Sequence, residues 1–189
     1  MHITIRLAGY GGYGVVTASR ILGLAFTRQG YHTLQTESHG AAARGGSCTT
    51  DLTISSNPIF ELGFDRPDIL ATLTAPAFLK CCSISPDLSS NFLLIESHLL
   101  DKQSIQSTLK ALKQESSTQV FRTELGQVAE ELGHVRYLGV ASLGAITKVD
   151  ERIDIELLET AVRSDVKLKR FAKENLHALH RGAELVSPY

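Results

Sequence analysis

The chain has 189 residues, of which 43% are hydrophobic and 21% are charged, which is the profile of a packed globular domain rather than of a disordered or fibrous protein. Lys and Arg total 19 against 20 Asp and Glu, so no excess of positive charge points to nucleic acid or to an anionic membrane. The longest run without a charged residue, 7–19, is glycine-rich and too short to span a bilayer, and the first residues lack the pattern of a secretory signal. We therefore expect a cytoplasmic protein with no membrane segment and no nucleic-acid partner.

The strands and helices expected in the first third alternate along the chain. Residues 2–8 alternate between polar and apolar and end in G-Y-G-G-Y-G, which predicts a strand followed by a tight glycine turn. A broad apolar face over 15–29, with Gly30 after it, predicts a largely covered helix. The sequence then predicts a strand over 31–37, a loop of small residues over 38–46 and a strand over 48–55.

The rest of the chain continues this alternation and ends in helices. Strands are expected at 69–73, 91–96 and 120–122, and helices at 75–80, 101–115, 125–132, 138–148, 155–163 and 168–182. No internal repeat or long linker interrupts the pattern. The sequence therefore predicts a single α/β domain over residues 1–189, with a mixed β-sheet, layers of flanking helices, a Rossmann-like first βαβ unit and a helical C-terminal third.

The glycine turn is the first candidate for binding chemistry. Glycines let the backbone turn tightly and approach a phosphate, while amide groups at the start of the following helix point toward the anion. Glu37, near the end of the second expected strand, is close to where an acid would accept the hydroxyls of a nucleotide ribose. The alternative is a turn that only packs against a partner, which the bulky Tyr10 and Tyr13 favour. The candidate phosphate-contacting positions are Gly9, Gly11, Gly12 and Gly14.

The second candidate is the sequence Arg44-Gly45-Gly46, which follows three alanines. An arginine among small residues can bind a phosphate or a carboxylate through two parallel hydrogen bonds, and glycines allow close backbone contact. The alternative is an ordinary solvated loop. No nucleophile elbow, Walker loop, zincin helix or kinase signature is present, so we assign no catalytic residue.

The cysteines and paired histidines do not indicate a metal site. Cys48, Cys81 and Cys82 form neither an even framework nor a C-x-x-C pair, and the vicinal pair is typical of small core residues. An iron–sulfur cluster usually needs four thiolates, so any cluster would belong to another subunit. His177 and His180 lie one helical turn apart without a third ligand at a recognisable spacing, which favours a structural interpretation over a bound metal.

Taken together, the two glycine-bearing segments resemble the gamma subunit of the 2-oxoacid:ferredoxin (or acceptor) oxidoreductases, which act on pyruvate, 2-oxoglutarate, ketoisovalerate or indolepyruvate. The resemblance extends over nearly the whole chain. The departures from the family pattern are Tyr13, His39 and Gly139, where the family usually has Gln, Tyr and Asn. The matching segments are Gly9 to Val15, Ile21-Leu22-Gly23, Gly40 to Gly46 leading into Asp51 to Ser55, Leu143-Gly144-Ala145, and Asn175, Leu176, Ala178 and Gly182.

This resemblance implies a division of labour among subunits. Alpha-, beta- and delta-type partner chains would carry thiamine diphosphate, Mg²⁺ and the iron–sulfur clusters, and the complex would convert an oxoacid and coenzyme A to acyl-coenzyme A while reducing ferredoxin or a similar acceptor. The chain itself would be inactive alone, and its glycine turn and Arg44-Gly45-Gly46 loop would help to receive coenzyme A and shape the subunit interface. Two other hypotheses stay open at this point: an independent NAD- or FAD-binding oxidoreductase that uses the turn with Glu37, and a purely structural scaffold.

Overall fold

The structure is a computed structural model that describes residues 1–40, 46–84, 91–115 and 117–189. Its described strands form one seven-stranded sheet in the order β2-β3-β1-β4-β5-β6-β7. The strands are β1 (His2–Tyr10), β2 (His32–His39), β3 (Ser47–Ser55), β4 (Ile69–Thr72), β5 (Phe92–Glu96), β6 (Gln119–Thr123) and β7 (Val186–Pro188). The α-helices are α1 (Val15–Arg28), α2 (Ala75–Ile84), α3 (Ser97–Leu100), α4 (Gln103–Glu115), α5 (Gly126–Glu131), α6 (Leu138–Val149), α7 (Ile155–Ser164) and α8 (Ala172–Glu184), with short 3-10 turns η1 (Val135–Tyr137) and η2 (Lys169–Phe171).

The sheet is mixed, as the sequence predicts. Strands β1, β4, β5 and β6 are parallel neighbours, whereas β3 runs antiparallel to both β1 and β2, and β7 runs antiparallel to β6. The β1–α1–β2 unit has parallel strands, but β3 lies between them. The predicted α/β fold class is therefore confirmed, and the insertion of β3 places the end of β2 two strands away from the end of β1.

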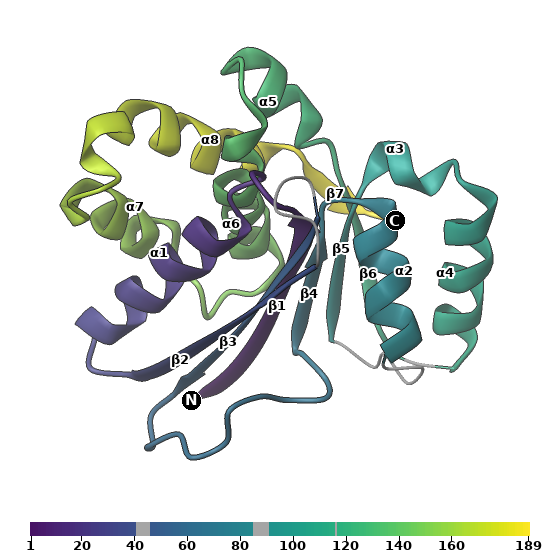
Figure 1. Ribbon diagram of the computed structural model, residues 1–189, viewed down its shortest axis with the longest axis horizontal. Helices are drawn as coiled ribbons and strands as arrows, with labels where there is room; N and C mark the ends of the chain where they lie inside the picture. The colour runs from purple at the N-terminus through teal and green to yellow at the C-terminus, as the bar shows by residue number, and fades with distance from the viewer. Residues whose placement is uncertain (41–45, 85–90, 116) are drawn as a thin grey trace.

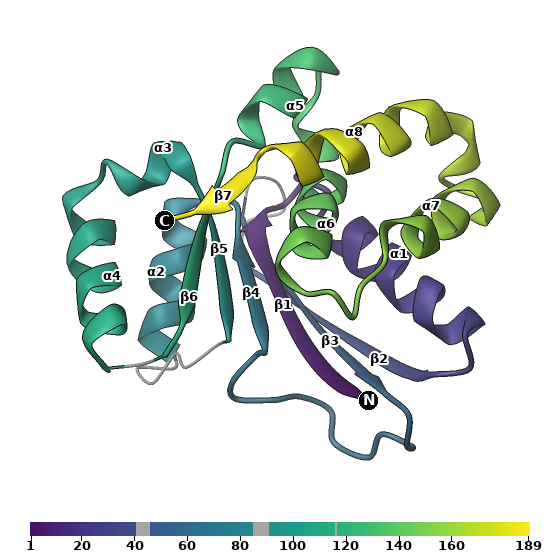
Figure 2. The same cartoon turned by 180° about the vertical axis from the view of Figure 1, so that it is seen from behind.

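Helices cover the sheet in two groups, with α1, α6, α7 and α8 on one side and α2, α3 and α4 on the other (Figures 1 and 2). The alternation in β1 explains this arrangement, because successive side chains of a strand point to opposite faces. Ile3, Ile5 and Leu7 belong to the core beneath α1 and α6, whereas Ala8 belongs to a second core with Phe78 of α2. Each face of the central strand thus buries its own apolar layer.

Helices α6 and α8 cross at very close range, and two glycines make this approach possible. A Cβ atom at Gly144 would overlap the Leu179 carbonyl oxygen, and one at Gly182 would overlap the Ala141 carbonyl oxygen. Gly144 and Gly182 belong to the two C-terminal segments that match the family pattern. Their physical role is therefore the packing of these two helices.

Several boundaries differ from the sequence-based expectations. Ser38 and His39 belong to β2 rather than to a loop, because they complete the ladder to Thr49 and Cys48 of β3. The helix expected over 168–182 is divided into η2 and α8, and the short elements α3 and β7 were not predicted. Among the described residues, no helix has the length and apolar character needed to cross a bilayer.

Candidate functional site

The glycine turn connects the carboxyl end of β1 to the start of α1 and uses two positive φ angles. Gly12 has φ +95°, and Gly14, the N-cap of α1, has φ +79°. These angles lie in the left-handed region, which glycine adopts without steric cost. Gly9 is tightly packed, since a Cβ atom there would lie 3.2 Å from Val15 Cγ2. The predicted turn is therefore present, directly between a strand and a helix.

The turn is held from the side by the start of α6. The Gly139 amide donates a hydrogen bond to the Tyr13 carbonyl oxygen at 2.8 Å. A Cβ atom at Gly14 would overlap the Arg136 carbonyl oxygen, and one at Gly139 would overlap the Gly14 carbonyl group. This contact accounts for Gly139, where the family usually has Asn, because the backbones of turn and helix touch there.

The backbone amides in the first turn of α1 are not capped by a side chain. No side chain caps the helix, and its first turn contains no acidic residue. The first amides of a helix have no partner within it and lie at the positive end of the helix dipole. This local geometry suits an anion.

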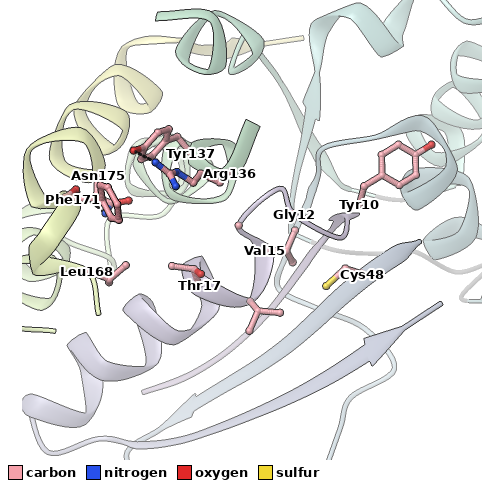
Figure 3. Close-up of a pocket in the computed structure, with 12 residues that line it drawn as sticks. Tyr10, Gly12, Val15, Thr17, Cys48, Arg136, Tyr137, Leu168, Phe171 and Asn175 are labelled. Atoms are coloured by element: carbon pink, nitrogen blue, oxygen red, sulfur yellow. Dashed lines mark hydrogen bonds between the residues drawn. The ribbon is translucent and has the colours of Figure 1, made fainter. Parts of the chain in front are cut away.

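A cavity of about 310 Å³ opens beside this helix start (Figure 3). Arg136 and Phe171 approach it from the η1 and η2 turns, opposite Thr17 of α1. The Arg136 guanidinium lies 4.7 Å from the centroid of the Phe171 ring and donates a hydrogen bond to the Tyr137 hydroxyl at 3.0 Å. Stacking and hydrogen bonding therefore fix the position of the Arg136 side chain among the residues that line this cavity. The lining residues are Tyr10, Gly12, Gly14, Val15, Val16, Thr17, Cys48, Arg136, Tyr137, Leu168, Phe171 and Asn175.

A second cavity, of about 350 Å³, lies on the other side of the turn. Tyr10 and Tyr13 pack edge to face, with ring centroids 5.6 Å apart, and both line this cavity. Glu96 at the end of β5 also lines it, but its carboxylate is already engaged, since it accepts hydrogen bonds from the Leu125 amide at 3.0 Å and the Gly126 amide at 2.9 Å. Tyr13 thus faces this second cavity, whereas Tyr10 lines both cavities.

The end of the second predicted loop reaches the glycine turn. The Gly11 amide donates a hydrogen bond to the Gly46 carbonyl oxygen at 2.8 Å, so the two glycine-bearing segments meet. Gly40 and Ser47 close the base of this loop through a hydrogen bond of 2.7 Å. Arg44 and Gly45 lie outside the described residues, so their predicted contacts stay predictions.

Glu37 is not brought to the turn. It lies on the edge strand β2, opposite Thr50, with β3 between it and β1. Its carboxylate accepts a hydrogen bond from the Gln35 side-chain amide at 3.0 Å and lies 3.2 Å from His39 Nε2. Since neighbouring strands are about 4.8 Å apart, Glu37 is roughly 10 Å from the β1 strand, too far for the ribose-binding position that the sequence suggested.

The cysteines and the two C-terminal histidines have structural surroundings. Burial raises the pKa of the Cys81 thiol, and it raises the pKa of the Cys82 thiol to about 12. His177 Nε2 lies 3.0 Å from Glu131, and His180 Nε2 lies 2.9 Å from Glu159, so the two rings have different partners. Within the described part of the chain, no three His, Cys, Asp or Glu side chains gather around a common point that could hold a metal.

Comparison with known proteins decides the family. Residues 4–185 match the pyruvate ferredoxin/flavodoxin oxidoreductase family. The chain belongs to this family. Among the family's members, the 2-oxoglutarate synthase subunit KorC of Methanothermobacter marburgensis is 29% identical over 98% of this chain and 97% of its own length. The pyruvate/ketoisovalerate oxidoreductases common subunit gamma of Pyrococcus abyssi is 29% identical over 85% of both chains.

Solved structures agree with this assignment. The gamma subunit of a keto/oxoacid ferredoxin oxidoreductase from Geobacter sulfurreducens is 25% identical, with a TM-score of 0.73 and 96% of each chain covered. A 2-oxoglutarate:ferredoxin oxidoreductase from Magnetococcus marinus, solved with 2-oxoglutarate, coenzyme A and succinyl-CoA bound, shares the fold at a TM-score of 0.79 and 18% identity, and the matching part is 30% of that chain. The chain is therefore a gamma-type subunit of an oxidoreductase complex, and the comparisons give no support to an independent NAD- or FAD-binding enzyme.

Arg136 is the main candidate residue that sequence reasoning missed. It lies in a short 3-10 turn between two helices, where no periodic pattern marks it. Only the contact of η1 and α6 with the glycine turn brings Arg136 to the cavity beside the start of α1. The one available signal was Gly139, a departure from the family pattern that lies three residues away.

Proposed function

We propose that this chain is the gamma subunit of a 2-oxoacid:ferredoxin oxidoreductase and that its glycine turn forms part of the route by which coenzyme A reaches the complex. Its alpha-, beta- and delta-type partners would supply thiamine diphosphate, Mg²⁺ and iron–sulfur clusters, and ferredoxin or a similar protein would accept the electrons. KorC relatives align over nearly the full length of both chains, which supports 2-oxoglutarate as the first oxoacid to test. Pyruvate, ketoisovalerate and indolepyruvate are the other candidates.

The observation that carries the coenzyme A proposal is the cavity beside the start of α1. Backbone amides without a side-chain cap and the stacked Arg136 guanidinium face the same space. Coenzyme A carries phosphate groups, which are the ligands that helix starts and guanidinium groups bind best. Gly46 accepts a hydrogen bond from the Gly11 amide, and Arg44 precedes Gly46 by two residues in the sequence, so we include Arg44 as a second candidate for the same phosphates.

Subunit membership is tested by co-expressing the tagged chain with the products of its neighbouring genes and purifying it. We expect co-purification of a subunit with a thiamine diphosphate motif and a cluster-binding subunit, identified by mass spectrometry. The complex should reduce ferredoxin or a viologen dye when 2-oxoglutarate and coenzyme A are both present. A chain that purifies alone and stays inactive in the mixture contradicts the proposal.

The coenzyme A route is tested separately in that complex, by replacing Arg136 with Ala. Loss of a charge-assisted hydrogen bond costs about 1.5–3 kcal/mol, so we expect the KM for coenzyme A to rise roughly tenfold or more, with little change in the KM for the oxoacid. Arg44→Ala should have the same direction of effect. Arg163→Ala is the control, because its partner Glu159 lies four residues away on the same exposed face of α7. If the KM for coenzyme A is unchanged in both the Arg44 and the Arg136 variant, the turn has only a structural role and the proposed route for coenzyme A is wrong.

A further inference from the structure

Positive charge is concentrated in a short segment before and at the start of α8. Four residues between positions 167 and 173 are Lys or Arg and none is acidic, although the whole chain has a formal net charge of −1. All four are exposed, and within the described part of the chain none of them forms an ion pair. The four residues are Lys167, Lys169, Arg170 and Lys173.

The backbone of this segment is held in place at both ends. The Asp165 carboxylate accepts hydrogen bonds from the Lys167 amide at 2.8 Å and from the Leu168 amide at 3.0 Å. At the other end, the Asn175 side-chain amide donates to the Phe171 carbonyl oxygen at 2.8 Å. The Leu168 side chain is buried in the core. Binding an anion here therefore requires the ordering of side chains only, which keeps its entropic cost low.

The same segment forms one wall of the cavity beside the start of α1 (Figure 3). Leu168 and Phe171 line the cavity, and Lys169 and Arg170 lie between them in the sequence. The Arg170 guanidinium is 5.5 Å from the centroid of the Phe171 ring. The Arg136 guanidinium is 4.7 Å from the same centroid. Two guanidinium groups therefore contact one ring of the cavity wall.

The charges around this cavity favour an anion. Among the described residues that line it, none is acidic, whereas Glu96 and Glu130 line the second cavity. Of the acidic residues that flank the basic segment, Asp165 is already bonded to backbone amides and lies 3.5 Å from Arg20. Glu174, in the first turn of α8, is the other. Positive charge therefore exceeds negative charge on this side of the cavity.

The size of the cavity indicates where a second phosphate would lie. Its volume of about 310 Å³ is at the lower end of the roughly 300–1,000 Å³ found for ligand pockets, so a molecule as large as coenzyme A must extend beyond it. Besides its diphosphate, coenzyme A has a separate phosphate monoester on its ribose. Such a group carries a charge of roughly −2 near neutral pH. The basic segment beside the cavity supplies the groups that bind it best.

We propose that Lys169 and Arg170 bind the phosphate monoester on the ribose of coenzyme A and thereby make the complex prefer coenzyme A over dephospho-coenzyme A, which lacks this group. A guanidinium binds a phosphate through two parallel hydrogen bonds, and an ammonium group adds a point charge. Lys167 and Lys173 increase the attraction from either side in the sequence. This inference rests on the proposed function, because it assigns specificity residues to the same coenzyme A route.

The test compares the two cofactors in the purified complex, with 2-oxoglutarate at saturation. For the wild type, we expect a KM for dephospho-coenzyme A that is roughly tenfold or more above the KM for coenzyme A. Lys169→Ala/Arg170→Ala should raise the KM for coenzyme A by a similar factor and leave the KM for dephospho-coenzyme A unchanged, so that the preference disappears. Lys110→Ala/Lys148→Ala removes two exposed positive charges from α4 and α6 and should retain the preference.

The other outcomes separate this inference from the proposed function. A wild-type complex with equal KM values for the two cofactors, or a Lys169/Arg170 variant that keeps the preference, overturns the inference while the effect of Arg136→Ala still tests the coenzyme A route. Equal loss of preference in the control variant shows a general effect of charge and also overturns it. A Lys169/Arg170 variant that no longer co-purifies with the other subunits assigns the segment to a subunit contact instead. If the Arg44 and Arg136 variants leave both KM values unchanged, the coenzyme A route fails and this inference fails with it.

Discussion

At Gly14, two separate restrictions act on one residue. Its φ of +79° lies in the left-handed region, and a Cβ atom would overlap the Arg136 carbonyl oxygen. The first restriction is the ordinary cost of a tight strand-to-helix turn. The second arises because η1, immediately before α6, lies against the turn, so Gly14 serves both the shape of the candidate site and the packing of the domain.

Gly14→Ala is therefore expected to destabilise the fold. The left-handed conformation costs a non-glycine residue about 1–2 kcal/mol, and the overlap adds to this. We expect a total of about 2 kcal/mol or more, which lowers the Tm by roughly 4–8 °C in a chain of this size. Gly63→Ala is the matched control, because nothing lies within 4 Å of a Cβ atom there and its φ is not positive. Equal Tm values for the two variants would contradict this account.

The cysteine thiols give a second prediction at the scale of single residues. Burial raises the pKa of Cys48, with a further contribution from the Glu37 carboxylate, and burial likewise raises the pKa of Cys81 and Cys82. Because the thiolate is the reactive form, all three should react slowly with a disulfide reagent at pH 8 in the folded chain. In guanidinium chloride they should react fully within minutes. Rapid modification of the native chain would show that at least one thiol is more accessible than the structure indicates.

Sequence reasoning located the glycine turn but not its surroundings. The turn was predictable because strand alternation, glycine spacing and a helical apolar face occur consecutively. Arg136 and Gly139 were not, because their proximity to the turn depends on how α6 packs against α1. Glu37 was placed near the turn on the assumption that β1 and β2 are neighbours, and β3 separates them.

At the scale of elements, α6 and α8 cross at very close range, and Gly182 is one of the two glycines that make this approach possible. We expect Gly182→Ala to cost about 1–3 kcal/mol, because the added methyl group must displace the Ala141 carbonyl oxygen or separate the helices. Lys173→Ala, on the exposed side of α8, should have a negligible effect. Denaturant titration followed by circular dichroism compares the two. If Gly182→Ala leaves the free energy of unfolding unchanged, the two helices can move apart without a loss of stability.

Helix α8 is also joined to α5 through Glu131, and this contact predicts a pH dependence. Hydrogen bonds from Arg181, and then from His177, lower the pKa of Glu131 from 4.5 to about 2. A pKa that is lower in the folded state stabilises the fold above the unfolded value, and this contribution disappears as the pH falls from about 4.5 to 2. Glu131→Gln should therefore lower the Tm slightly at pH 7, and the difference from the wild type should vanish near pH 2. Glu151→Gln, in an exposed turn, should show no such pH-dependent difference.

The order of elements was largely predictable from sequence, whereas their neighbours in the sheet were not. Apolar runs such as 69–72 and 92–96 indicate buried strands wherever they lie in the sheet. Nothing in residues 47–55 indicates that this strand inserts between β1 and β2, because its alternation would suit any position with one face covered by a helix. The short β7 escaped detection because Pro188 and its three-residue length give little strand signal.

At the scale of the whole molecule, the sheet order separates this chain from dinucleotide-binding enzymes that share its glycine spacing. In those folds the strand after the first helix lies beside the first strand, so an acid at its end reaches the ribose of a nucleotide bound at the turn. Here the corresponding position is at the edge of the sheet, and Glu37 is engaged with Gln35 and His39. The phosphate site that we propose at the glycine turn is therefore not accompanied by a ribose site at Glu37.

This arrangement predicts that the isolated chain binds neither NAD nor FAD. Calorimetric titration at concentrations near 100 µM should give no heat beyond dilution for either dinucleotide, because phosphate contacts at the turn alone lack the hydrogen bonds to the ribose and a pocket for the second nucleotide. A dinucleotide-dependent dehydrogenase titrated in the same buffer verifies that the measurement detects micromolar binding. Glu37→Ala provides the decisive comparison if heat is observed. If NAD or FAD binds at micromolar concentration and Glu37→Ala abolishes that binding, Glu37 must reach a dinucleotide bound at the turn. The sheet order would then no longer explain why this glycine turn belongs to a subunit rather than to an independent oxidoreductase.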